Sequence, residues 1–163
     1  MSHAGKEILQ RKSELGRELC ATLYFLPEKT IVTPVYVNDA GIHYEQDTPI
    51  MIDRPLSSDE LGKLAVAALI TFAIKDRNLR DTKKTDWPSF KVSGIKSVRA
   101  FESAAIRLSV GTVNANLQIR GWPSADDAIH VATCAAPAVQ HSELGRLIMQ
   151  VVACCQKLRT DEL

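Results

Sequence analysis

The sequence predicts an α+β fold in which a mostly antiparallel sheet is covered by two or three helices, as a single pair of layers. Segments rich in β-branched and aromatic residues follow one another across short links, which is typical of antiparallel strands. Two apolar stripes of helical period, at 56–75 and 142–158, indicate helices that cover this sheet. With 163 residues, we expect a single domain, 1–163, whose ends at 1–5 and 160–163 are flexible.

The N-terminal half is predicted to begin with a helix and continue as strands. Leucine and isoleucine at helical spacing indicate a helix at 4–19. Residues 21–26 and 30–37 are rich in β-branched and aromatic residues, with a proline-containing turn between them. Residues 42–44 and 49–52 are predicted to pair with each other as a second hairpin.

A helix start is encoded around Ser57. Ser57 and Glu60 have the S-x-x-E spacing of a capping box, in which each side chain accepts a hydrogen bond from a backbone N–H of the other residue. Leu56 and Leu61 flank the box at the positions of a hydrophobic staple. Apolar residues then recur at helical spacing as far as Phe72, which predicts a helix lying on the sheet.

The C-terminal half is predicted to hold further strands and a last helix. Residues 76–91 are charged and interrupted by Pro88, which predicts a long loop, and Ser97 is placed to cap a short helix. The remaining predicted elements are strands at 106–110 and 113–119 around a turn at Gly111 and Thr112, a strand at 128–134, and a final helix capped by Ser142.

Motifs of catalysis are missing from the sequence. It contains no phosphate-binding glycine loop, no nucleophile elbow and no histidine pair at metal-ligand spacing. His43, near several carboxylates, is a candidate base or ligand, but alternation along a half-exposed strand gives the same pattern. His130, inside a predicted strand, is interpreted as structural. We therefore expect no enzymatic activity, no cofactor and no metal.

Composition narrows the location of the protein. The net charge is +1 and 45% of residues are hydrophobic, which is ordinary for a globular protein. No apolar run is long enough for a membrane span, and the N-terminal residues lack the apolar core of a secretion signal. The four cysteines form no C-x-x-C pair and are interpreted as apolar filler in a reducing compartment. We expect a cytoplasmic protein with no membrane partner.

Charge is unevenly distributed along the chain. Residues 38–60 contain six acids and one base, whereas residues 63–107 contain ten bases and four acids. An acidic segment attracts a basic protein such as a nuclease. The basic 75–99 segment indicates a nucleic-acid-binding module instead, with Lys83, Lys84, Trp87, Phe90 and Lys91 as its binding residues. Alternatively, both segments are solvated faces that neutralise each other in the fold.

Several segments between residues 20 and 105 resemble bacterial immunity proteins of contact-dependent growth inhibition systems. The segments that carry the resemblance are Leu23 to Tyr36, Leu56 to Leu69, Trp87 to Phe90, and Lys96 to Glu102. The resemblance implies a bacterial, cytoplasmic, non-enzymatic toxin inhibitor. Such a protein binds the C-terminal domain of a large secreted toxin, often a nuclease, and blocks its active or RNA-binding face by a protein–protein interaction.

If the toxin is a nuclease, the acidic segment is the first candidate for the binding face. A nuclease presents positive charge to the phosphates of its substrate. Carboxylates on a rigid surface attract that charge, so we expect Asp39, Glu45, Asp47 and Asp53 to contribute to partner binding. Reversing their charge is expected to slow association, mostly at low salt.

Overall fold

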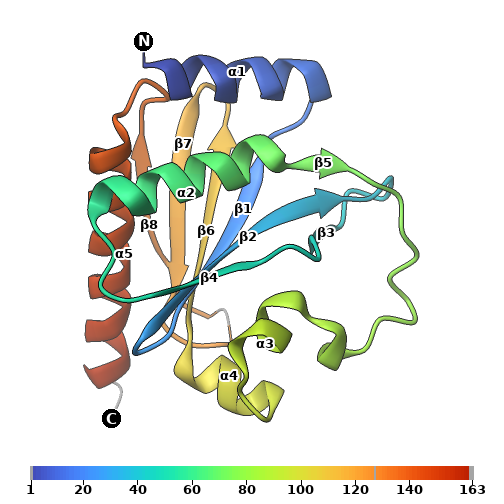
Figure 1. Ribbon diagram of the computed structural model, residues 1–163, viewed down its shortest axis with the longest axis vertical. Coiled ribbons are helices and arrows are strands. Elements are labelled where there is room, and N and C mark those ends of the chain that lie inside the picture. Colours follow the sequence, from blue (N-terminus) through green and yellow to red (C-terminus); the bar gives the residue numbers. More distant parts are fainter. Residues whose placement is uncertain (1, 127, 162–163) are drawn as a thin grey trace.

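The computed structural model describes residues 2–126 and 128–161 and confirms the predicted α+β fold, with a sheet that is antiparallel apart from one short strand (Figure 1). Of the ends expected to be flexible, residue 1 and residues 162–163 lie outside the described part. The helices and strands follow in the order α1 (His3–Leu15), β1 (Cys20–Phe25), β2 (Lys29–Val37), β3 (His43–Glu45), β4 (Ile50–Asp53), α2 (Ser58–Thr71), β5 (Ala73–Ile74), the 3-10 helix η1 (Lys84–Asp86), α3 (Pro88–Ser93), α4 (Val98–Ala104), β6 (Ile106–Val113), β7 (Asn116–Trp122), β8 (Val131–Ala135) and α5 (His141–Asp161).

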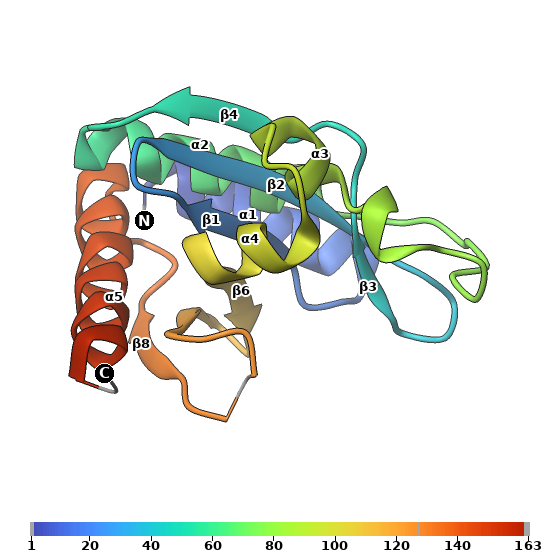
Figure 2. The same cartoon turned by 90° about the horizontal axis from the view of Figure 1, so that it is seen from below.

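The sheet has the strand order β3-β2-β1-β6-β7-β8, and both β4 and β5 also pair with β2. Strands β1 and β6 form its centre, and β5 is the strand that runs parallel to its neighbour. Figure 2 shows α5 beside β8 at one edge of the sheet and β3 near the other. Because β6 and β7 alternate buried and less buried residues, each of these two strands has one side chain row facing the helices and one facing away.

The main hydrophobic core lies between the sheet and the helices α1, α2 and α5. It contains the inward rows of the central strands, such as Leu23, Leu108 and Ile119, together with the apolar stripes of the helices. A second, smaller core lies on the other side of β1, where Tyr24 and Ile31 pack against Phe101 of α4. No helix in the described part of the chain covers the rest of that side, and we call it the open face.

The predicted start of α2 is confirmed. The Ser57 hydroxyl accepts a hydrogen bond from the Glu60 amide at 3.2 Å, and the Glu60 carboxylate accepts one from the Ser57 amide at 3.1 Å. The box satisfies two backbone donors that a helix start otherwise leaves without partners.

Helices α2 and α5 approach each other more closely than side chains normally permit. A Cβ atom at Gly62 of α2 would lie 1.9 Å from the carbonyl oxygen of His141, and one at Gly145 of α5 would lie 1.8 Å from that of Ser58. Both obstacles are backbone atoms at the start of the other helix, so no side chain rotation relieves them. The absence of a side chain at each glycine therefore sets the distance between the two helices.

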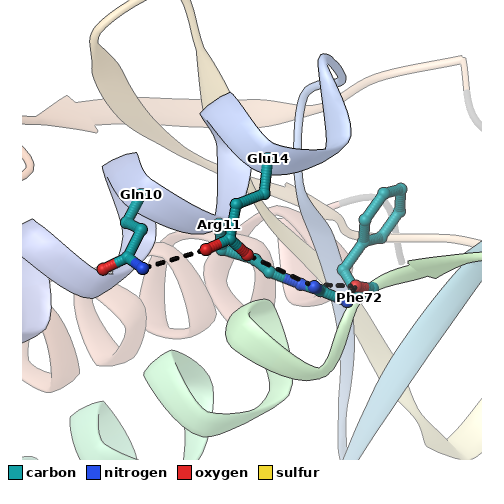
Figure 3. Close-up of polar contacts among 4 residues, drawn as sticks. All are labelled: Gln10, Arg11, Glu14 and Phe72. Carbon is teal, nitrogen blue, oxygen red and sulfur yellow. Dashed lines mark hydrogen bonds and ion pairs between the residues drawn. The ribbon is translucent and has the colours of Figure 1, made fainter.

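An arginine of α1 satisfies the end of α2 (Figure 3). The Arg11 guanidinium donates to the carbonyl oxygen of Phe72, the C-cap of α2, through Nη2 at 2.9 Å and Nε at 3.3 Å. Glu14 lies 3.6 Å from the same guanidinium and accepts a hydrogen bond from Gln10. This arrangement attaches α1 to α2 at a carbonyl that the helix itself leaves without a partner.

The prediction of a second hairpin is wrong, because β3 and β4 both pair with β2 instead of with each other. Pro34, in the middle of β2, explains the break between them. Its carbonyl accepts a hydrogen bond from the Gln46 amide at 2.9 Å, so its ring nitrogen, which has no hydrogen to donate, faces the same edge. Proline is tolerated in a sheet where the neighbouring ladder is interrupted.

Four further boundaries differ from the sequence prediction. Pro88 begins α3 instead of extending the loop, because proline at the first position of a helix loses no hydrogen bond. The turn between β6 and β7 falls at Asn114, whose φ of 55° suits a two-residue hairpin turn, and not at Gly111 and Thr112. Helix α5 starts at His141, so Ser142 lies inside it, and β8 runs from Val131 to Ala135.

The close crossing of α2 and α5 predicts that replacing its glycines by alanine destabilises the fold, the opposite of the usual effect of Gly→Ala in a helix. In an ordinary helix, Gly→Ala stabilises by about 1 kcal/mol. At Gly62 and Gly145 the added methyl group forces the helices apart, at a cost of about 1–3 kcal/mol or more. We therefore expect Gly62→Ala and Gly145→Ala each to lower the free energy of unfolding, measured by urea denaturation. Ala67→Gly, at an exposed position of α2, is the control for ordinary helix propensity, and a stabilising Gly62→Ala would contradict the prediction.

Candidate functional site

The open face is hollowed between β1, β3, β6 and the segment that contains η1. One cavity of about 560 Å³ is lined by residues from these elements. A neighbouring cavity of about 190 Å³ is lined in part by the same residues. The two share Cys20, His43, Ser109 and Trp122. We call the combined depression the open-face hollow.

The strand register arranges the side chains on the floor of the hollow. Tyr24, Arg107 and Trp122 lie opposite one another on β1, β6 and β7. The next row that faces the same way contains Thr22, Ser109 and Arg120. Thr22 and Ser109 thus put small polar side chains in the middle of the floor, while the large aromatic and basic side chains of the two rows surround them.

One wall of the hollow is held by the carboxylate of Glu45, at the end of β3. Its Oε1 accepts hydrogen bonds from the Tyr24 hydroxyl at 2.6 Å and from Nε1 of Trp87 at 2.8 Å. Its Oε2 accepts from the Ser89 amide at 2.9 Å and the Ser89 hydroxyl at 2.7 Å. Glu45 therefore ties β1, β3 and the start of α3 together, and four donors occupy its oxygens.

An aromatic cluster continues this wall into the second core. The Trp87 ring meets Phe101 edge-on with centroids 4.9 Å apart, and Tyr24 and Phe90 lie 5.2 and 5.9 Å from the same Phe101 ring. Burial, followed by the negative charge of Glu45, raises the pKa of Tyr24 well above its usual value. The Tyr24 hydroxyl therefore stays protonated near neutral pH and acts as a donor to Glu45.

Two groups with catalytic potential, Cys20 and His43, line the hollow. Burial raises the pKa of Cys20, so its side chain is the thiol and not the nucleophilic thiolate. Partial burial, with a smaller effect from the positive charge of Arg17, lowers the pKa of His43. Among the described residues, no group of three or more His, Cys, Asp or Glu side chains is arranged to hold a metal ion.

The four acids proposed for partner binding do not form one patch. Asp53 pairs with Lys29 beside one end of β2, whereas Asp39 follows the other end. The nine residues of β2, at about 3.3 Å per residue, separate these ends by on the order of 26 Å. Asp39 and Asp47 are exposed on either side of β3, and the Glu45 oxygens are occupied by internal donors. Partner binding by these acids stays a prediction.

The residues of the nucleic-acid alternative are divided between surface and core. Lys83, Lys84 and Lys91 are exposed, and the first two line the hollow. The rings of Trp87 and Phe90, by contrast, pack in the second core. These two rings therefore do not form an open platform on which bases could stack.

Sequence reasoning did not identify Tyr24, Arg107 or Arg120 as residues of the site. Strict alternation from Leu117 to Trp122, with apolar and polar residues in turn, was the available pattern. It shows that Arg120 and Trp122 share one face of their strand. It does not show which residues of β1 and β6 lie beside them, because that depends on strand register.

Comparison with known proteins finds similarity at the level of structure. No protein-family model matches the chain, and no curated protein matches it. A protein of unknown function from Neisseria meningitidis superposes with a TM-score of 0.69 at 17% identity, over 86% of this chain and 96% of the other. A chain of a CdiA-CT/CdiI toxin and immunity complex from Yersinia pseudotuberculosis superposes with a TM-score of 0.65 at 12% identity, over 86% and 98%. At these identities, the similarity shows a shared fold.

The second of these structures is a toxin and immunity complex, the kind of assembly that the resemblance of residues 20–105 implies. The described helices include none that is both long and apolar enough to cross a membrane.

The Glu45 contacts predict a structural role that mutation can measure. Glu45→Ala leaves the buried Tyr24 and Ser89 donors without their acceptor, and each buried unsatisfied group costs about 1–3 kcal/mol. We expect the free energy of unfolding to fall by about 3 kcal/mol in urea denaturation followed by tryptophan fluorescence. Asp47→Ala, at an exposed neighbouring acid, should change stability by less than about 0.5 kcal/mol. Equal stabilities of the two variants would contradict the role of Glu45.

Proposed function

We propose that this chain is an immunity protein that binds the toxin domain of a contact-dependent growth inhibition system and neutralises it. The toxin domain is a nuclease, and the protein acts in the cytoplasm without enzymatic activity of its own. The observation that carries the proposal is the fold shared with a chain of a toxin and immunity complex, over 86% of this chain and 98% of the other.

The sequence resemblance selects the immunity component from the two kinds of protein in that complex. Its segments fall in β1 and β2 at the sheet, in α2, and in the Trp87-to-Glu102 region that contains α3 and α4. Apart from α2, each of these elements contributes residues to the open-face hollow or to the second core that supports it. The resemblance therefore concerns the part of the molecule that shapes the candidate binding surface.

Inhibition of this kind requires association and no chemistry. A stable interface covers about 800 Å² on each partner, which is far more than the hollow alone, so the surrounding loops are expected to take part. Asp39 and Asp47 lie next to β3, whose His43, Tyr44 and Glu45 line the hollow. We expect these two acids to meet the basic surface that a nuclease presents to its substrate.

Co-expression tests the function directly. The partner is the C-terminal region of a large exported protein encoded immediately upstream of this gene. We expect this region alone to arrest growth, and we expect co-expression of the chain to restore growth and give a complex that survives gel filtration. A nuclease toxin should also degrade nucleic acid in vitro, and a stoichiometric amount of the chain should suppress that degradation.

A toxic region from a different strain is the specificity control, because immunity depends on differences in affinity between cognate and non-cognate partners. If the cognate region is toxic and the folded chain neither binds it nor restores growth, the proposal fails. If the chain binds and restores growth but the toxin degrades no nucleic acid, the immunity function stands and the nuclease assignment fails.

A further inference from the structure

Arg120 lies on the open face with part of its hydrogen-bonding capacity unused. Its Nη2 donates to Oε1 of Gln118 at 2.9 Å. Its Nε is buried and has no hydrogen-bond partner among the described residues. In the described part of the structure, Nε of Arg120 is the buried side-chain nitrogen or oxygen atom that has no hydrogen-bond partner. A buried N–H without an acceptor is uncommon in folded proteins and indicates a missing partner.

The geometry of the guanidinium limits what that partner can be. Nε and a terminal nitrogen of arginine form a fork that matches the two oxygens of a carboxylate or a phosphate. Small side chains lie next to it on the strands, with Ser109 opposite on β6 and Ala132 opposite on β8. Arg120 also lines the smaller cavity of the hollow. An acidic group that enters this cavity comes beside Arg120, and it meets Nε when the guanidinium turns toward the cavity, because Nε is buried in the unbound chain.

The charges around Arg120 distinguish a protein from a nucleic acid. Basic side chains that line the hollow include Arg77, Lys83, Lys84 and Arg107. Acidic side chains line it as well, namely Glu18, Glu45, Asp86 and Glu102. A nucleic acid carries negative charge at every phosphate and would meet these acids at close range. A protein segment can place one carboxylate at Arg120 and neutral or basic groups near the acids.

The surroundings of the two tryptophans also favour a protein partner over a nucleic acid. The Arg107 guanidinium lies 4.4 Å from the centroid of the Trp122 ring and covers one of its faces. Trp87 packs against Phe101 in the second core. Neither tryptophan ring is open on both faces, so consecutive bases of a nucleic acid could not stack on both sides of it.

We propose that the open-face hollow is a contact surface for the toxin, and that Arg120 there receives a carboxylate from a side chain of the toxin. This inference rests on the proposed immunity function and adds the surface and the chemistry of the contact. It differs from binding through acidic residues of this chain, because here the immunity protein provides the positive charge.

The test measures affinity between purified full-length chain and the upstream-encoded toxin region. Arg120→Gln removes the charge and the fork, and loss of a charge-assisted hydrogen bond of this kind should weaken binding on the order of 10- to 100-fold. Arg120→Lys keeps the charge without the fork and should give a smaller loss. Arg99→Gln, the same change at an exposed position of α4 outside the hollow, is the matched control and should alter affinity by less than about twofold.

A second measurement leaves this chain unchanged. The carboxylates of the toxin region are replaced one at a time by amides, and one of these replacements should lower the affinity as much as Arg120→Gln does. When that replacement and Arg120→Gln are combined, the affinity should fall no further. This non-additivity identifies the pair, and it remains measurable if Arg120→Gln lowers the stability of the chain, because Arg120→Lys can take its place.

The outcomes separate the two proposals. If the unaltered chain binds the toxin and both Arg120 variants bind equally well, this inference is overturned and the immunity function stands. If the unaltered chain does not bind the toxin, both are overturned. If the unaltered chain binds a short single-stranded RNA with steep salt dependence, and Arg120→Gln abolishes that binding while toxin binding is unchanged, the hollow is a nucleic-acid surface and the inference is overturned.

Discussion

At the crossing of α2 and α5, two glycines bring the backbone of each helix against the start of the other. This contact determines which face of the sheet the helices cover. Because α5 is held by α2 at its first turns, its remaining length runs along β7 and β8, where Val151 and Cys155 would lie 2.7 and 2.9 Å from a Cβ at Gly121. A side chain at Gly62, Gly145 or Gly121 would displace α5 from the sheet. The opposite face is left without a long helix, and it is there that the hollow forms.

On that face, hydrogen bonds to Glu45 hold the elements together, whereas on the other face a large hydrophobic core does so. The second core is small, and the segment from Ala73 to Ser97 contains little regular structure to hold it in place. Four donors to one carboxylate fix the start of α3 to β1 and β3. Charge-assisted hydrogen bonds in a partly buried site are stronger than those between neutral groups. The shape of the hollow therefore depends on a polar contact, while the scaffold depends on close packing.

The sequence was informative where structure is local and uninformative where it depends on register. The capping box at Ser57 and Glu60 is complete within four neighbouring residues, so it could be identified in advance. The pairing of β3 and β4 with β2 could not, since it depends on which edge the Pro34 nitrogen faces. Likewise, Glu45 was identified from the local charge of its segment, but its donors are between 21 and 44 residues away along the chain.

The same limit explains the outcome for charge. A cluster of acids in sequence predicts an acidic surface only if the chain keeps them together. Here β3 and β4 follow different halves of β2, so Asp39 and Asp53 are carried to opposite ends of it, and Glu45 turns toward internal donors. Basic residues, by contrast, are brought together by the fold. Arg107 and Arg120 lie on different strands, and the pairing of β6 with β7 puts both on one face of the sheet.

A surface of mixed charge has consequences for specificity that a uniformly acidic one lacks. An acidic face attracts basic proteins in general, and its attraction is long-ranged and weakened by salt. In the hollow, by contrast, a buried arginine N–H lies among both acidic and basic side chains. A partner therefore has to place charges of the correct sign at several positions at once to bind favourably. A partner that lacks the carboxylate leaves the Arg120 N–H buried and unsatisfied, which disfavours binding. Under the proposed function, discrimination between related toxins would follow from short-range complementarity at the floor of the hollow, and the net charge of +1 is compatible with tight binding.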